Sequence, residues 1–174
     1  MMSRSTFTAV LFAAATVGFG FAAQPAAAQT YVVGVENIDY LPQYAYKDGE
    51  YGGFARALLD AFANDKGYKL EYRALPVTRL FAEFVNLDVD LKYPDNVKWS
   101  ADLKSKATVI YSDPVVKYID GVNVTPDRVG KGAESLKVLG AVRGFTPWDW
   151  LDAVKSGTVK LQENNSFSAM LETT

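Results

Sequence analysis

The sequence predicts an α/β fold built from βαβ units. Two observations support this prediction: short apolar strands alternate along the chain with amphipathic helices, and the connections between them are short. Parallel strands need helical crossovers of this kind, because tight turns join only antiparallel strands. A second strand-loop-helix series follows a polar, glycine-containing connector at residues 126–132. We therefore expect two lobes of the same type.

The first unit begins with a strand at residues 31–35, and an aromatic loop and a glycine-rich turn at 47–53 follow it. In open α/β sheets, loops at the carboxyl ends of strands bind ligands. A helix is then predicted, because apolar residues recur at i, i+3, i+4, i+7 and i+8 and make one continuous apolar face. The residues of this face are Phe54, Ala57, Leu58, Ala61 and Phe62.

The second unit repeats this order. Gly67 suits the left-handed cap of the first helix, and an alternating strand follows at residues 69–75. Pro76 then breaks the chain before a second helix at 77–85, and a short strand at 89–92 closes the unit. The helix is predicted because helical apolar spacing recurs at Val77, Leu80, Phe81, Phe84 and Val85.

Beyond this unit the pattern weakens. We expect a turn at residues 93–96, a weak helix at 99–106 and a fourth strand at 107–111. Residues 115–124 form a further extended run, and the connector at 126–132 comes after it.

The second lobe is predicted to start with a strand at residues 138–142. Thr146 and Pro147 have the character of an N-cap and a first helical residue. A strand at 159–162 and the beginning of a helix at 166–171 follow. No closing strand comes after them in this sequence, so we expect an incomplete second lobe.

The head of the chain predicts a secretory signal peptide at residues 1–28. Arg4 gives a basic start, residues 7–23 are almost wholly apolar, and Ala26 to Ala28 satisfy the small-residue cleavage rule. The alternative is a membrane anchor, because residues 7–23 approach the length that spans a bilayer. The Ala/Gly richness and the Ala-x-Ala end favour cleavage after Ala28, and hence a periplasmic location.

The composition excludes several classes of function. The chain has neither cysteine nor histidine, so Ser-His triads, Cys-His pairs and ordinary zinc sites are excluded. Without residues 1–28 the net charge is −3, which argues against a nucleic-acid partner. We expect no cofactor and no metal. An exported protein without disulfides has to rely on its hydrophobic core, as bacterial periplasmic proteins do.

The order of these motifs resembles the bacterial family 3 extracellular solute-binding proteins, the periplasmic receptors of polar amino-acid ABC importers. The resemblance implies a two-lobed periplasmic-binding-protein-like fold, a membrane permease as partner, and a chain that is truncated at its C-terminus. It rests on Asp48-Gly49, Gly53-Phe54, Asp90, Tyr111-Ser112-Asp113-Pro114-Val115 and Val142-Arg143-Gly144. One departure concerns the ligand: the family usually has an arginine that grips an α-carboxylate, and residues 99–106 contain lysines only.

These considerations divide the chain into a signal peptide at 1–28, lobe one at 29–124, and a connector with a partial lobe two at 125–174. The predicted function is capture of a small polar solute, an amino acid or related carboxylate, by a monomer. A ligand-sensing module of a signalling system is the alternative. A periplasmic enzyme would have to use carboxylates, and we expect no catalysis; the carboxylates available near the cleft are Glu36, Asp39, Asp90 and Asp95.

Seven residues are predicted to contact the ligand. Tyr40 follows the first strand and offers a ring for stacking, although loop packing would explain it equally well. A polar and aromatic cluster at 92–99 follows the third strand, where turn chemistry or a core role for its members is the alternative. Arg143 precedes Gly144 and is suited to an anion, unless it is a surface arginine. The seven residues are Tyr40, Lys92, Tyr93, Asn96, Trp99, Arg143 and Thr146.

Overall fold

The computed structural model describes residues 27–173, and the predicted signal peptide lies almost entirely outside this range. A three-stranded parallel sheet of order β4-β1-β5 is the centre of the first lobe, with β1 at Thr30–Glu36, β4 at Lys69–Leu75 and β5 at Leu91–Tyr93. β1 pairs with β4 along its whole length and with β5 near its carboxyl end. The predicted parallel βαβ arrangement is confirmed.

The aromatic loop after β1 folds into a small antiparallel hairpin of β2, Ala45–Lys47, and β3, Glu50–Gly52. Asp48 and Gly49 form its turn with φ of 52° and 85°, a left-handed conformation that aspartate and glycine tolerate best. The hairpin places tyrosine rings beside the carboxyl end of β1.

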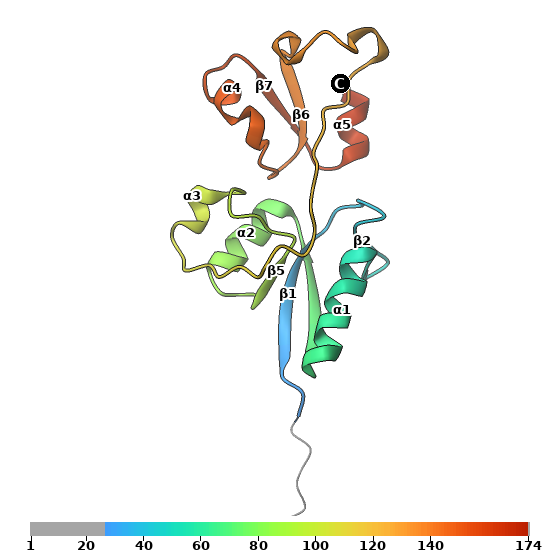
Figure 1. The fold of residues 1–174 in the computed structure, drawn as a ribbon, viewed down its shortest axis with the longest axis vertical. Coiled ribbons are helices and arrows are strands. Elements are labelled where there is room, and N and C mark those ends of the chain that lie inside the picture. Colours follow the sequence, from blue (N-terminus) through green and yellow to red (C-terminus); the bar gives the residue numbers. More distant parts are fainter. Residues whose placement is uncertain (1–26, 174) are drawn as a thin grey trace, which may run out of the picture.

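Two helices cover the two faces of this sheet (Figure 1). α1, Phe54–Lys66, packs against β4 and the hairpin, and α2, Val77–Val85, packs against β1 and β5. Gly34 lies in β1 under α2, where a Cβ atom would come within 2.5 Å of Leu80 Cδ1. The predicted apolar face of α2 is confirmed, since Val77, Leu80 and Phe81 are buried.

The predicted apolar face of α1 is wrong. Phe54 and Phe62 are 48% and 42% exposed, whereas Ala55 and Ala63 are buried. The neighbouring side of the lobe is already filled by tyrosine rings, so only small side chains let the helix backbone approach it.

Residues 107–125 form no strand, in contrast to the two extended runs predicted there. They follow α3, Ala101–Lys104, as irregular chain and lead to short 3₁₀ turns at Pro126–Arg128 and Ala133–Ser135. A strand needs a neighbouring strand for its hydrogen bonds, and the described residues supply none. Apolar side chains are consequently left in solvent, with Ile110 90% and Ile119 87% exposed.

The second lobe contains two parallel strands, β6 at Val138–Val142 and β7 at Lys160–Asn164. α4, Leu151–Lys155, connects them after a 3₁₀ turn at Trp148–Trp150, and α5, Phe167–Thr173, follows β7. The predicted strands and the last helix are confirmed.

The helix start predicted at Thr146 and Pro147 is wrong. Regular α-helix begins only at Leu151, and the Thr146 side chain caps no helix. Its hydroxyl oxygen accepts a hydrogen bond from the other lobe instead.

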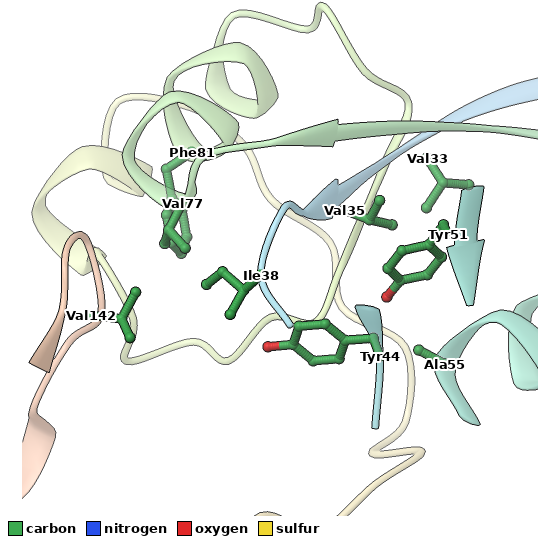
Figure 2. Packing of buried hydrophobic residues seen from close by; sticks show 9 residues of the cluster. All are labelled: Val33, Val35, Ile38, Tyr44, Tyr51, Ala55, Val77, Phe81 and Val142. Carbon is green, nitrogen blue, oxygen red and sulfur yellow. The ribbon is translucent and has the colours of Figure 1, made fainter. Parts of the chain in front are cut away.

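The main hydrophobic cluster reaches from lobe one into lobe two (Figure 2). Val142, at the end of β6, packs with the α2 residues Val77 and Phe81. Gly144 follows at φ 89°, and a Cβ atom there would lie 2.7 Å from Thr78 Oγ1, so glycine permits the close approach of the lobes. Among residues 27–173, no helix combines the length and the apolar character needed to cross a membrane.

Candidate functional site

A cleft of about 1050 Å³ lies between the two lobes. The carboxyl ends of β1 and β6 point toward it from opposite sides (Figure 1). Its walls combine aromatic side chains from both lobes and the connecting chain with polar and charged groups; the aromatic residues are Tyr40, Tyr44, Phe81, Trp99, Tyr118, Phe145, Trp148, Trp150 and Phe167. A cavity with rings and converging polar groups is typical of small-molecule sites.

The floor of the cleft contains a buried carboxylate. Glu36 is the last residue of β1, lines the cleft and is 2% exposed. The hydroxyl of Tyr44, also buried, donates a hydrogen bond of 2.5 Å to Glu36 Oε2. Burial raises the pKa of Glu36, and Lys92 and the Tyr44 hydrogen bond oppose this rise.

A buried cluster of two lysines and one aspartate lies behind the cleft. Lys104 Nζ lies 3.0 Å from Asp95 Oδ2, and Lys92 Nζ lies 3.5 Å from Asp95 Oδ1. The side chains of Lys92, Asp95 and Lys104 are only 0%, 8% and 5% exposed. Both ammonium groups also lie over the ring of Phe81, at 4.0 and 5.6 Å from its centroid. This cluster fixes the loop at 93–99, which carries Trp99 to the cleft.

Three contacts join the lobes around the cleft. The backbone N–H of Ser100 donates to Thr146 Oγ1 at 3.1 Å. Lys98 Nζ lies 4.5 Å from the centroid of the Trp148 ring. The rings of Tyr40 and Phe167 stack with centroids 5.0 Å apart. The two lobes are therefore in direct contact around the cleft.

Three of the seven predicted ligand-contacting residues line the cleft. These are Tyr40, Trp99 and Thr146. Tyr40 and Thr146 contribute to the contacts between the lobes, and Trp99 packs edge-on against Tyr118 with centroids 6.0 Å apart. Contact of these residues with a ligand stays a prediction.

The other four predicted residues do not line the cleft. Lys92 is buried and donates to the carbonyl oxygen of Pro94, and Asn96 Oδ1 accepts from the N–H of Lys98 in a tight turn. The Tyr93 hydroxyl is buried. Arg143 is exposed, and its backbone N–H donates to the carbonyl of Asn164. These placements give Lys92 and Asn96 structural partners and leave Arg143 outside the cavity.

Sequence reasoning missed Tyr118 and Phe167 as cleft residues and considered Glu36 only as a catalytic carboxylate. Tyr118 lies in the irregular connecting chain, where no periodicity indicates which side chains turn inward. The position of Glu36 directly after an apolar strand was the one available signal, because that position faces the ligand side of such sheets.

The remaining carboxylates considered for catalysis lie elsewhere. Asp39 pairs with Lys47 in solvent, Asp90 accepts from the backbone N–H of Val32, and Asp95 belongs to the lysine cluster. Of this set only Asp95 acts on Glu36, whose pKa its charge helps to raise, and no hydrogen bond joins the two carboxyl groups within residues 27–173. Within residues 27–173, no three His, Cys, Asp or Glu side chains converge as a metal site.

Comparison with known proteins gives matches to solved structures. No family model matches the sequence, and no curated protein matches it. An ancestral arginine-binding protein bound to arginine aligns over 84% of this chain with 20% identity and a TM-score of 0.59. The ancestral amino acid-binding protein AncCDT-1, a precursor of cyclohexadienyl dehydratase, aligns over 82% with 19% identity and a TM-score of 0.60. The fold is that of two-lobed periplasmic binding proteins.

The BvgS VFT2 domain of Bordetella pertussis shares this fold, with 18% identity over 82% of the chain and a TM-score of 0.56. The chain spans 65%, 64% and 60% of the lengths of the three matched structures. The likeness at these identities concerns the fold, and ligand and partners have to be inferred from the site.

Proposed function

We propose that this protein is a periplasmic solute-binding protein that captures a small polar solute between its lobes and delivers it to the permease of an ABC importer. One observation supports this proposal above the others: an aromatic cleft of about 1050 Å³ opens where the carboxyl ends of β1 and β6 meet. The matched structures include an arginine-binding and an amino acid-binding protein, so amino acids are the first solutes to test.

Binding in this cleft would combine ring contacts with polar contacts, because aromatic and charged side chains both line it. Closure of the lobes removes the solute from water, which strengthens each polar contact. The predicted signal peptide supports a periplasmic location.

A sensing role is the second candidate. The matched structures also include the BvgS VFT2 domain and the AvGluR1 ligand-binding domain in complex with glutamate. A sensor and an importer receptor would share the capture step, so the same cleft serves both. Interaction with a permease distinguishes importer receptors from sensors.

The capture step can be tested by fluorescence, because every tryptophan of the chain lines the cleft: Trp99, Trp148 and Trp150. Titration of the purified full chain with amino acids, amines, carboxylates and sugars is expected to give a saturable change for one class. Tyr40→Ala should weaken that binding about fivefold, since an aromatic contact contributes about 1 kcal/mol.

Phe62→Ala is the matched control, because Phe62 is a half-exposed ring on α1 outside the cleft lining. It should leave the affinity unchanged. Absence of saturable binding for all four solute classes would refute the proposed function.

A further inference from the structure

The carboxylate of Glu36 has spare hydrogen-bonding capacity in the cleft. Its Oε2 accepts from Tyr44, and no other hydrogen bond and no ion pair to the carboxylate occurs among residues 27–173. A carboxylate offers about four acceptor sites. A buried charge of this kind is stable only with further donors or a cation beside it.

Several buried tyrosine hydroxyls interact electrostatically with this carboxylate or with one another. Those of Tyr51, Tyr93 and Tyr118 have no hydrogen-bond partner of good geometry within residues 27–173. Burial raises the pKa of Tyr51 and of Tyr118, and both Tyr93 and Glu36 add to each rise, which places the four groups within electrostatic range of one another. The side chains of Tyr93 and Tyr118 interact with each other, and this contact opposes the rise in the pKa of Tyr93 and adds to the rise in that of Tyr118. Buried hydroxyls usually have partners, so a missing polar group is indicated here.

The charges of the cleft lining favour a cation. Three carboxylates line it, those of Glu36, Asp120 and Asp149, against a single basic side chain, Arg128. The buried lysines behind the cleft pair with Asp95, and Lys92 also interacts electrostatically with Glu36. Lys92 and Lys104 both direct their ammonium groups to Asp95 and to backbone carbonyls.

The rings above this floor also suit a cation. Tyr118 lines the cleft and meets Trp99 edge-on, with Tyr40 and its stacked partner Phe167 in the same lining. The negative face of an aromatic ring attracts an ammonium group within about 6 Å. The same rings would cover an alkyl or aryl chain attached to it.

We propose that the cleft binds a primary organic amine without a carboxylate, with its ammonium group held by Glu36 and the hydroxyl of Tyr118, which both line the cleft. The ammonium has three N–H donors, and the two carboxylate oxygens of Glu36 and the Tyr118 hydroxyl offer three acceptors. This inference rests on the proposed function and names its solute class.

The test compares three molecules that differ only in charged groups: 2-phenylethylamine, phenylalanine and 3-phenylpropionate. Calorimetry with the purified full chain is expected to show binding of 2-phenylethylamine, with phenylalanine at least tenfold weaker and 3-phenylpropionate without measurable binding. The aliphatic pair 1,5-diaminopentane and lysine should follow the same order.

Glu36→Gln keeps an acceptor for the Tyr44 hydroxyl but removes the charge, and should weaken amine binding at least tenfold. Tyr118→Phe keeps the ring and should weaken it severalfold. The matched control is Asp39→Asn, an exposed carboxylate that pairs with Lys47 outside the cleft, which should change nothing. Far-ultraviolet circular dichroism of each variant verifies the fold.

The outcomes separate the two proposals. Preferred binding of 3-phenylpropionate or phenylalanine, or unchanged amine binding in Glu36→Gln, would overturn the amine assignment and leave solute capture intact. Binding of no compound from any class would overturn solute capture, and the amine assignment with it.

Discussion

Lys104 is expected to be one of the most sensitive positions for stability. Its ammonium group donates to both carboxylate oxygens of Asp95 at 3.2 and 3.0 Å, to the carbonyl of Asn96 and to the Tyr111 hydroxyl. Lys104→Met keeps the aliphatic stem but leaves Asp95 buried with a weaker partner. Loss of one member of a buried pair costs about 3–5 kcal/mol. Since Lys92 remains 3.5 Å from Asp95, we expect the lower end of that range.

Urea unfolding of the full chain, followed by tryptophan fluorescence and circular dichroism, measures this cost. With an m-value of about 2 kcal/mol/M, a loss of about 3 kcal/mol lowers the midpoint by about 1.5 M. Asp95→Asn in the Lys104→Met background removes the uncompensated charge and should recover part of the loss. Lys106→Met is the control, because this exposed lysine two residues away has no ion pair among the described residues. A loss below about 0.5 kcal/mol, as expected for the control, would refute the structural importance of the cluster.

Two further predictions concern residues of β1. The pKa of Glu36 is raised in the folded protein, so the folded state holds its proton more tightly and loses stability as pH rises from 4.5 through the raised pKa. Glu36→Gln should therefore increase the free energy of unfolding at pH 7, and the difference from the wild-type chain should shrink as pH falls toward 4.5; destabilisation by this change at pH 7 would show that Lys92 outweighs burial. Gly34→Ala should cost about 1–3 kcal/mol in thermal unfolding, because its Cβ would approach Leu80 Cδ1 to 2.5 Å. Gly52→Ala is the control, because open space surrounds this position, and it should cost less than about 0.5 kcal/mol. Equal effects of the two substitutions would contradict the close packing of Leu80 in α2 against Gly34 in β1.

Local sequence patterns predicted the strands and the helix whose apolar residues recur with regular spacing. The strands at β1, β4, β6 and β7 and the face of α2 follow from alternation and helical spacing alone. The face of α1 could not be predicted in this way. Two faces of that helix are apolar, and tertiary packing selects the one with Ala55 and Ala63 because the hairpin already fills the space with Tyr44 and Tyr51.

The location of the site could be predicted better than its chemistry. The carboxyl ends of the strands indicated Tyr40 and Trp99, which line the cleft. The lysines could not be placed, because a long side chain can turn inward to a carboxylate or outward to a ligand, and only the fold decides. Lys92 turns inward, to Asp95 and the Phe81 ring. Tyr118 could not be found either, because irregular chain has no periodicity to indicate its inner face.

Three contacts between the lobes bear on how the binding of a small solute shifts the arrangement of the lobes. The Ser100–Thr146 hydrogen bond, the Lys98–Trp148 contact and the Tyr40–Phe167 stack each contribute about 0.5–1.5 kcal/mol. Together these contacts contribute a few kcal/mol, in addition to the packing of Val142 against Val77 and Phe81. A solute that bridges both walls adds its binding energy to the closed state alone and shifts the population toward it. Because Tyr40, Thr146 and Trp148 also line the cleft, the solute and the closing contacts act through the same side chains.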